Sequence, residues 1–231
     1  MQGRLRIRRR ASPDGPWRHG STVPPVEAVY KRLAPVYDLL YGVGLQHGRR
    51  RAMARLSPRA GERILEIGVG TGLSAVGYPS GCQVVAIDLS APMLARARAR
   101  LARRRVGHVA LCRMDGTQLA FPDARFDAVY APYVINVVPD PLLVAREMLR
   151  VCRPGGRLVL LNHFAPADGS TGVTTRLAGG VATRATGVNW NLELDAFLRD
   201  AGLTALSVDH VNLRVSSVVV CRKCQPGDHR P

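Results

Sequence analysis

The stretch Arg63-Ile64-Leu65-Glu66-Ile67-Gly68-Val69-Gly70-Thr71-Gly72 decides the fold of this chain. Its first part, Ile64 to Ile67, is short, branched and mostly apolar, which predicts a buried β-strand. Three glycines follow at every second position, and they lack the Cβ atom that would hold a ligand away from the backbone. The stretch therefore predicts a strand, a sharp turn and a close approach of backbone to a bound molecule.

Two nucleotide-binding interpretations of this turn compete. A dinucleotide fingerprint requires Gly-x-Gly-x-x-Gly before a helix whose N-terminus faces a pyrophosphate. Counted from Gly68, its third glycine would fall where this chain has Leu73. Glu66 also precedes the first glycine, and a carboxylate is a poor neighbour for a pyrophosphate. The spacing and the charge favour a positively charged ligand without phosphate, such as S-adenosylmethionine (SAM).

The segment from Glu66 to Gly72 resembles motif I of the class I SAM-dependent methyltransferases, and the resemblance extends over residues 26–223. It implies a Rossmann-like α/β fold with a mostly parallel sheet and an antiparallel C-terminal strand. The structural alternative is a glycine turn that only connects a strand to a helix. The segments that follow argue against this alternative, because they fall where the family needs them.

Composition and charge indicate one domain with extensions. Residues 1–25 are Arg-rich without apolar periodicity, which predicts a disordered basic arm; residues 26–223 form the predicted methyltransferase domain and residues 224–231 a tail. The formal net charge of +16 favours anionic partners such as lipid, nucleic acid or acidic protein. No RNA-binding motif is recognisable, so nucleic acid is the weaker prediction. No transmembrane helix is predicted, because there is no run of eighteen apolar residues.

A helix is predicted directly after the basic arm. Pro35 should kink it or split it into two. It could cap the mouth of the cofactor site, or it could also lie on an anionic membrane surface, and the two interpretations are compatible. Its apolar residues recur at helical spacing: Val26, Val29, Tyr30, Leu33, Tyr37, Leu40 and Tyr41.

Strands and helices alternate along the rest of the chain, which predicts a parallel α/β sheet. Further strands are expected at residues 83–88, 109–112, 126–130 and 157–161, the last after a tight turn at 153–156, with a final antiparallel pair at 203–213 and 215–221. Helices are expected after the cap residue Ser90, from Asp140-Pro141 to about Cys152, and from Leu192 to Ala201.

Asp88 ends the second predicted strand, twenty residues after Gly68, where a carboxylate can accept both ribose hydroxyls of a nucleoside. By resemblance, Asp115 lies where family members contact the adenine amino group. No cluster of metal ligands is recognisable, so no metal is predicted. The full set of predicted cofactor contacts is Tyr37, Glu66, Gly68, Gly70, Gly72, Asp88, Leu89, Met93, Asp115, Gly116 and Ala131.

Methyl transfer from a sulfonium is an in-line displacement, which requires a nearly collinear nucleophile and the exclusion of water. A protonated amine cannot attack, so an amine-methylating site needs a route for the proton to leave. In this type of sheet the ligand lies at the carboxyl ends of the strands. The residues predicted there as catalytic, each of which could also be structural, are Tyr37, Tyr133, Asn136 and His163.

Residues 29–38, 66–74, 131–139 and 161–164 together resemble the soluble bacterial phosphatidylethanolamine N-methyltransferases. That family uses SAM to methylate the ethanolamine nitrogen of the lipid up to three times, which gives phosphatidylcholine. The resemblance implies a phospholipid substrate, an anionic membrane surface as partner, and a cytoplasmic protein that is peripheral on the inner membrane.

Two other activities stay open. One is methylation of a quinone or another small apolar acceptor, because such enzymes share the same sheet. The other is RNA methylation, which the basic charge invites. Tyr130-Ala131-Pro132-Tyr133 partly resembles the Asn-Pro-Pro-Tyr motif of some amine methyltransferases: Pro132 and Tyr133 match, whereas Tyr130 stands at the amide position.

Overall fold

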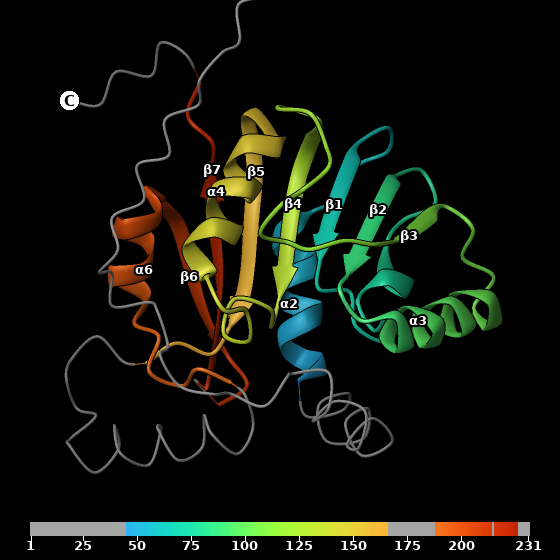
Figure 1. Ribbon diagram of the computed structural model, residues 1–231, viewed down its shortest axis with the longest axis horizontal. Helices are drawn as coiled ribbons and strands as arrows, with labels where there is room; N and C mark the ends of the chain where they lie inside the picture. Colours follow the sequence, from blue (N-terminus) through green and yellow to red (C-terminus); the bar gives the residue numbers. More distant parts are fainter. Residues whose placement is uncertain (1–44, 166–187, 214, 226–231) are drawn as a thin grey trace, which may run out of the picture.

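The computed structural model describes residues 45–165, 188–213 and 215–225; the predicted basic arm, the predicted cap helix and Tyr37 lie outside these ranges. The described strands form one sheet in the order β3-β2-β1-β4-β5-β7-β6 (Figure 1). They are β1 (Arg63–Ile67), β2 (Gln83–Asp88), β3 (Val109–Arg113), β4 (Phe126–Pro132), β5 (Cys152–Asn162), β6 (Ala205–Val211) and β7 (Ser216–Arg222). The helices are α2 (Gln46–Leu56), α3 (Ala91–Arg103), α4 (Pro141–Val151) and α6 (Leu194–Ala201), with a 3₁₀ turn η1 (Ala75–Gly77).

Strand direction confirms the predicted fold class. Strands β1 to β5 are mutually parallel, whereas β7 pairs antiparallel with both β5 and β6. The carboxyl ends of the parallel strands therefore share one edge, which is the lower edge in Figure 1. Because β5 and β6 both run opposite to β7, they point the same way, and the β6–β7 turn lies at that edge too.

Helices cover both faces of the sheet (Figure 1). Leu56 of α2 and Leu94 of α3 belong to the apolar cluster on one face. Met148 of α4 and Phe197 of α6 belong to the cluster on the other. No helix within the described ranges is long and apolar enough to cross a membrane.

The predicted helix boundaries agree with local capping. The backbone N–H of Leu143 donates to the Asp140 side chain at the start of α4, at 3.0 Å. The Ser90 hydroxyl accepts from the Met93 N–H at the start of α3. Gly202 takes the left-handed conformation that ends α6. Helix α6 begins at Leu194, two residues after the predicted start.

Helix α2 was not predicted. Its buried positions are Gly48, Ala52 and Leu56, which recur at every fourth residue. Two of the three are so small that they give little apolar periodicity. The arginines around them hide the stripe in the sequence.

The predicted turn at residues 153–156 is wrong in one respect, because these residues lie within β5. Cys152 pairs with Phe126 of β4 and Arg157 pairs with Ala128, so the four residues 153–156 of β5 lie opposite the single residue Asp127 of β4. Such a surplus makes a bulge, and Gly155 with φ of 71° allows it. The strand therefore begins five residues earlier than predicted.

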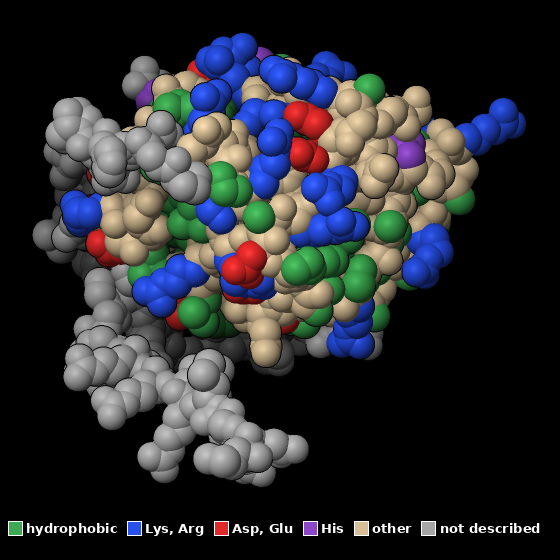
Figure 2. Space-filling model, turned by 90° about the horizontal axis from the view of Figure 1, so that it is seen from above, with side chains coloured by type: hydrophobic (Ala, Val, Ile, Leu, Met, Phe, Trp, Pro, Cys, Tyr) green, Lys and Arg blue, Asp and Glu red, His purple; other side chains and the backbone are tan. Residues whose placement is uncertain are grey.

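Basic side chains are spread over the end of the molecule that carries the amino ends of the parallel strands. Figure 2 shows this end from above, with Lys and Arg interspersed among apolar and acidic side chains. The positive charge of the chain is therefore not confined to the edge at the carboxyl ends of the strands.

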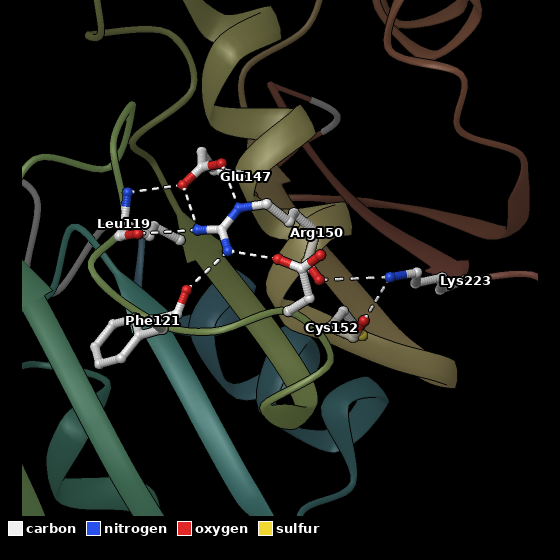
Figure 3. A network of polar contacts seen from close by, with 7 residues as sticks. Leu119, Phe121, Glu147, Arg150, Cys152 and Lys223 are labelled. Atoms are coloured by element: carbon white, nitrogen blue, oxygen red, sulfur yellow. Dashed lines mark hydrogen bonds and ion pairs between the residues drawn. The ribbon is translucent and has the colours of Figure 1, made fainter. Parts of the chain in front are cut away.

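Arg150, on the last turn of α4, joins a polar network at this amino end (Figure 3). Its guanidinium donates to both carboxylate oxygens of Glu147, at 2.7 and 2.8 Å, and to the Asp123 carboxylate at 2.8 Å. It also donates to the backbone carbonyls of Leu119 and Phe121. The hydrogen bond from Arg150 lowers the pKa of the Glu147 carboxyl. The network fastens the segment before β4 to α4.

We expect Arg150→Ala to lower the free energy of unfolding by about 2 kcal/mol, because it leaves two carbonyls without this donor and leaves Glu147 only the Leu119 N–H, at a partly exposed site. Chemical denaturation measures this loss. Arg146→Ala, at an exposed position of the same helix, is the matched control and should change it by less than about 0.5 kcal/mol. Equal effects of the two substitutions would contradict a stabilising role for the network. SAM affinity should not change, because the network lies at the opposite end from the carboxyl edge.

Candidate active site

A cavity of about 610 Å³ lies at the carboxyl ends of the central strands. Its walls come from the glycine turn after β1, the end of β2, the segment after β3 and the segment between β4 and α4. The sequence-predicted residues that line it are Gly68, Gly70, Asp88, Leu89, Met93, Asp115, Gly116 and Tyr133. Five others do not line it: Glu66, Gly72, Ala131, Asn136 and His163.

The glycine turn is held against β2 by its own backbone. The N–H groups of Gly68 and Val69 both donate to the Ile87 carbonyl, at 2.8 and 2.9 Å. Gly68, Gly70 and Gly72 all have φ between 55° and 80°, where side chains with a Cβ are strained. Gly70 opens on the cavity, since an added Cβ would meet no atom within 4 Å.

Gly72 was predicted to contact the cofactor, but it packs on α3. A Cβ at this position would lie 3.1 Å from the Cα of Ala97. Gly72 therefore permits a close approach of helix and turn rather than of turn and ligand. Ala131 is likewise fully buried inside β4, one residue before the lining residue Pro132.

Asp88 closes the cavity at the end of β2. One carboxylate oxygen accepts from the Gly70 N–H at 2.8 Å and the other accepts from the Ser90 N–H at 2.9 Å. Burial raises the pKa of the Asp88 carboxyl, and these backbone donors lower it again in part. Each oxygen keeps a second lone pair, so the oriented carboxylate can still accept from a ligand hydroxyl.

The segment after β3 supplies the next part of the wall. The Asp115 carboxylate accepts from both the N–H and the hydroxyl of Thr117, each at 2.8 Å, which fixes the direction of its side chain. Met93 and Met114 add apolar wall nearby. A fixed carboxylate beside flexible apolar side chains suits a flat heterocycle with an amino group.

Glu66 lies beneath the turn rather than on the cavity wall. It is fully buried, and neither carboxylate oxygen has a hydrogen-bond partner within the described ranges. Burial is the largest effect on its carboxyl and raises the pKa to about 7, although the hydroxyls of Tyr78 and Ser74 and the Arg49 guanidinium offset part of it. Glu66 does not line the cavity, and its direct contact with the cofactor stays a prediction. It can act on the cavity by its charge.

Tyr133 is the predicted catalytic residue that reaches the cavity. Its φ of 55° turns the chain at the end of β4. Its hydroxyl accepts a hydrogen bond from the Asn212 side-chain amide at 2.9 Å. The Arg49 guanidinium, which also lines the cavity, lies 5.1 Å from the centre of its ring. Burial raises the pKa of the Tyr133 phenol, which therefore stays protonated near neutral pH.

His163 lies next to Tyr133 but does not line the cavity, so its catalytic role stays a prediction. Its ring is buried between Trp190 and Tyr133, with ring centroids 4.8 and 5.2 Å away. Its Nδ1 lies 3.1 Å from the Val215 carbonyl and 3.0 Å from the Ser216 hydroxyl. Because a carbonyl only accepts, Nδ1 carries the hydrogen. Burial lowers the pKa of His163, which keeps it neutral.

Asn136 does not line the cavity either, and its catalytic role likewise stays a prediction. Its amide nitrogen donates to the backbone carbonyls of His163 and Asn189, at 2.6 and 2.8 Å. These bonds fasten the segment after β4 to the end of β5 and to the segment before α6. Asn136 therefore holds the ends of three segments together, beneath the cavity rather than inside it.

Two residues important to this wall were missed by sequence reasoning. Arg49 has no sequence signal of its own, because it stands in a run of three arginines. Asn212 has none either, because its role comes from its position in the turn after β6. Asn212 also accepts from the Gly48 N–H at 3.1 Å. A Cβ on Gly48 would lie 2.7 Å from Tyr133 and from Asn212, so this glycine lets α2 reach the site.

Similarity to known proteins agrees with this geometry. A family model described as a methyltransferase domain matches residues 65–160. A phosphatidylethanolamine N-methyltransferase of Cereibacter sphaeroides is 46% identical over 62% of this chain and 70% of that protein. A demethylmenaquinone methyltransferase of Clavibacter sepedonicus is 33% identical over 87% of this chain and 90% of that protein. The chain belongs to the class I SAM-dependent methyltransferases.

Solved structures support the same fold for this methyltransferase. A SAM-dependent methyltransferase from Aquifex aeolicus superposes with a TM-score of 0.60 at 17% identity, over 86% of this chain and 98% of that one. Membership of the family, which the two relatives and the methyltransferase-domain model show, confirms the predicted SAM-dependent activity and the SAM cofactor.

The cavity residues fit SAM. Asp88 can accept the ribose hydroxyls, Gly68 and Gly70 offer backbone without side chains, and Leu89, Met93 and Asp115 surround space for the adenine. Bound SAM supplies an electrophilic methyl group on its sulfonium. The protein's own contribution is to hold the two reactants in line and to keep water out, and Tyr133 with its fixed hydroxyl stands on the wall where an acceptor could be oriented.

Proposed function

We propose that this methyltransferase N-methylates phosphatidylethanolamine and its methylated intermediates, giving phosphatidylcholine, at the surface of a membrane. The 46% identical relative carries that name. The structural observation that supports the proposal most is Arg49, which puts a guanidinium on the cavity wall beside Tyr133. A guanidinium is complementary to the phosphodiester next to the ethanolamine amine.

The chemistry also limits the role of Tyr133. The amine must lose a proton before its lone pair can attack the methyl group. Because the Tyr133 phenol stays protonated near neutral pH, it can orient the amine but cannot take the proton as a phenolate. Each methyl transfer therefore releases a proton that passes to water at the mouth of the site.

The test is incubation of the protein with labelled SAM and vesicles that contain phosphatidylethanolamine and an anionic lipid. Label should appear in mono-, di- and trimethylated phosphatidylethanolamine, resolved by mass spectrometry. Absence of label in the lipid, while calorimetry shows intact SAM binding, would rule this substrate out.

Arg49→Gln provides a sharper measurement. We expect it to raise the KM for the lipid about tenfold, since it removes one charged hydrogen-bond donor, and to change SAM affinity by much less. Arg103→Gln, at an exposed position in the last turn of α3 and away from the cavity, is the matched control and should change the KM less than about twofold. An unchanged KM in Arg49→Gln would remove the contact with the phosphodiester from the proposal.

The second candidate is C-methylation of a demethylated quinone. The relative named for this activity matches a larger part of the chain, 87%, although at 33% identity. Methylation of demethylmenaquinone, together with no labelling of phosphatidylethanolamine, would decide for this alternative.

A further inference from the structure

The exposed large apolar side chains of the described residues gather at the edge that carries the cavity. Leu89 follows β2 at the cavity mouth, and Leu143 lies on the first turn of α4, also at the mouth. Leu213 and Val215 lie in the turn between β6 and β7, where Leu213 is 97% exposed and Val215 is 50% exposed. The remaining two, Leu206 and Val208, lie along the edge strand β6.

Asn212 anchors the start of the β6–β7 turn, whereas the side chains of Leu213 and Val215 are exposed. Asn212 and Leu213 have φ of 50° and 56°, and the Val215 N–H donates to the Asn212 carbonyl at 3.1 Å. The Asn212 side chain is bonded to Gly48, Tyr133 and Ser216, on three different segments. Asn212, at the start of this turn, is therefore part of the support of Tyr133.

The charges around this turn favour an anionic surface. The first turns of α2, which Asn212 contacts through Gly48, carry Arg49, Arg50 and Arg51. Arg51 is paired with Asp209, whereas Arg50 is exposed. Asp209 on β6 is also paired with Arg55, whereas Asp88, Asp115 and Asp140 at the same edge line the cavity rather than the turn. Basic side chains also cover the opposite end of the molecule (Figure 2), so charge alone does not determine which end faces a membrane. The exposed apolar side chains of the turn favour the edge that carries the cavity.

We propose that the β6–β7 turn inserts Leu213 and Val215 into the interfacial region of an anionic bilayer and so seats the cavity mouth against the lipid. The inference rests on the proposed function only in that the acceptor lies in a membrane. A turn with two apolar side chains is too small for a stable protein interface, which usually buries more than about 1,000 Å². The same two side chains suffice for interfacial insertion when nearby arginines add attraction to anionic lipid.

The experiment is sedimentation of the full chain with vesicles of phosphatidylcholine and about one third phosphatidylglycerol, with no phosphatidylethanolamine. Leu213→Asp should weaken binding about tenfold or more, because it replaces an inserted apolar side chain by a charge that repels the surface. Leu206→Asp is the matched control, because Leu206 is 60% exposed on the same hairpin but lies near the amino end of β6, about 20 Å away. It should change binding by less than about twofold.

Equal loss of vesicle binding in Leu213→Asp and Leu206→Asp, or no loss in either, would overturn the proposal. SAM affinity by calorimetry should be the same in both variants, which excludes misfolding as the cause. Since the vesicles contain no acceptor lipid, the binding result does not depend on which acceptor is methylated. Activity on a short-chain phosphatidylethanolamine dissolved below its micelle concentration should survive Leu213→Asp, and parallel loss of this activity would also count against membrane seating as the role of the turn.

Discussion

Gly70→Ala is expected to reduce SAM affinity at least about a hundredfold while the protein stays folded. Gly70 lines the cavity, and an added Cβ would meet no protein atom within 4 Å, so the methyl group takes space that the ligand needs. Its φ of 55° is left-handed, which costs an L-residue roughly 1–2 kcal/mol. A loss of that size shifts the melting temperature of a chain this long by about 2–8 °C. Calorimetry with SAM and thermal unfolding of the free protein measure the two effects separately.

Two other glycines give matched controls. Gly61 has φ of 84° and an equally open Cβ position, but it lies before β1 and away from the cavity. Gly61→Ala should therefore lower the melting temperature similarly and leave SAM affinity intact. Gly68→Ala should destabilise more than either, because its Cβ would lie 2.8 Å from Val134. SAM binding by Gly70→Ala that equals wild type would remove the glycine turn from the binding site.

The fold could be predicted because its signals are local. The strand before Gly68, the carboxylate of Asp88 at the end of the next strand and the cap at Asp140 each have a sequence pattern tied to one backbone geometry. Helix α2 was not predicted, because two of its three buried residues are small. The bulge in β5 was not predicted, because it depends on the pairing with β4, and no local sequence pattern indicates that pairing.

The site was predictable on the cofactor side and less so on the acceptor side. Residues that follow directly after parallel strands must meet at the carboxyl edge, which is why Asp88 and Tyr133 were found. That rule does not say which side chains face the cavity. His163 and Asn136 also follow strands but turn toward backbone carbonyls behind Tyr133. Arg49 and Asn212 reach the site through contacts far apart in the sequence.

Glu66→Gln is expected to make the protein without SAM more stable than wild type by about 3 kcal/mol near pH 8, and the difference should disappear below about pH 4. Burial raises the pKa of the Glu66 carboxyl from its ordinary value of 4.5 to about 7 in the folded protein. Between these values the folded state holds a proton that the unfolded chain has lost. The contribution of Glu66 to stability is therefore fully present below pH 4.5 and is lost as pH rises to about 7. The contribution of a glutamine to stability does not change over this pH range, because its amide does not titrate.

Urea denaturation at several pH values between about 5 and 8 measures the effect as a change in the slope of stability with pH. Glu147→Gln is the control of opposite sign. The Arg150 hydrogen bond lowers the pKa of Glu147, so this carboxylate stabilises the fold above its ordinary pKa and its removal should destabilise the protein near neutrality. If the stability of Glu66→Gln and that of wild type changed with pH in parallel, this would contradict a raised pKa of the Glu66 carboxyl.

The same variant connects stability to function. A buried carboxylate without a hydrogen-bond partner in the described residues destabilises a neutral-pH protein, yet it lies directly beneath a turn that receives a cationic cofactor. When SAM is bound, its positive charge favours the ionised form of Glu66, which offsets part of the cost of burial. Glu66→Gln should therefore gain stability and lose SAM affinity, most clearly above about pH 7, and a variant that gains both would show that Glu66 does not act on the cofactor through its charge.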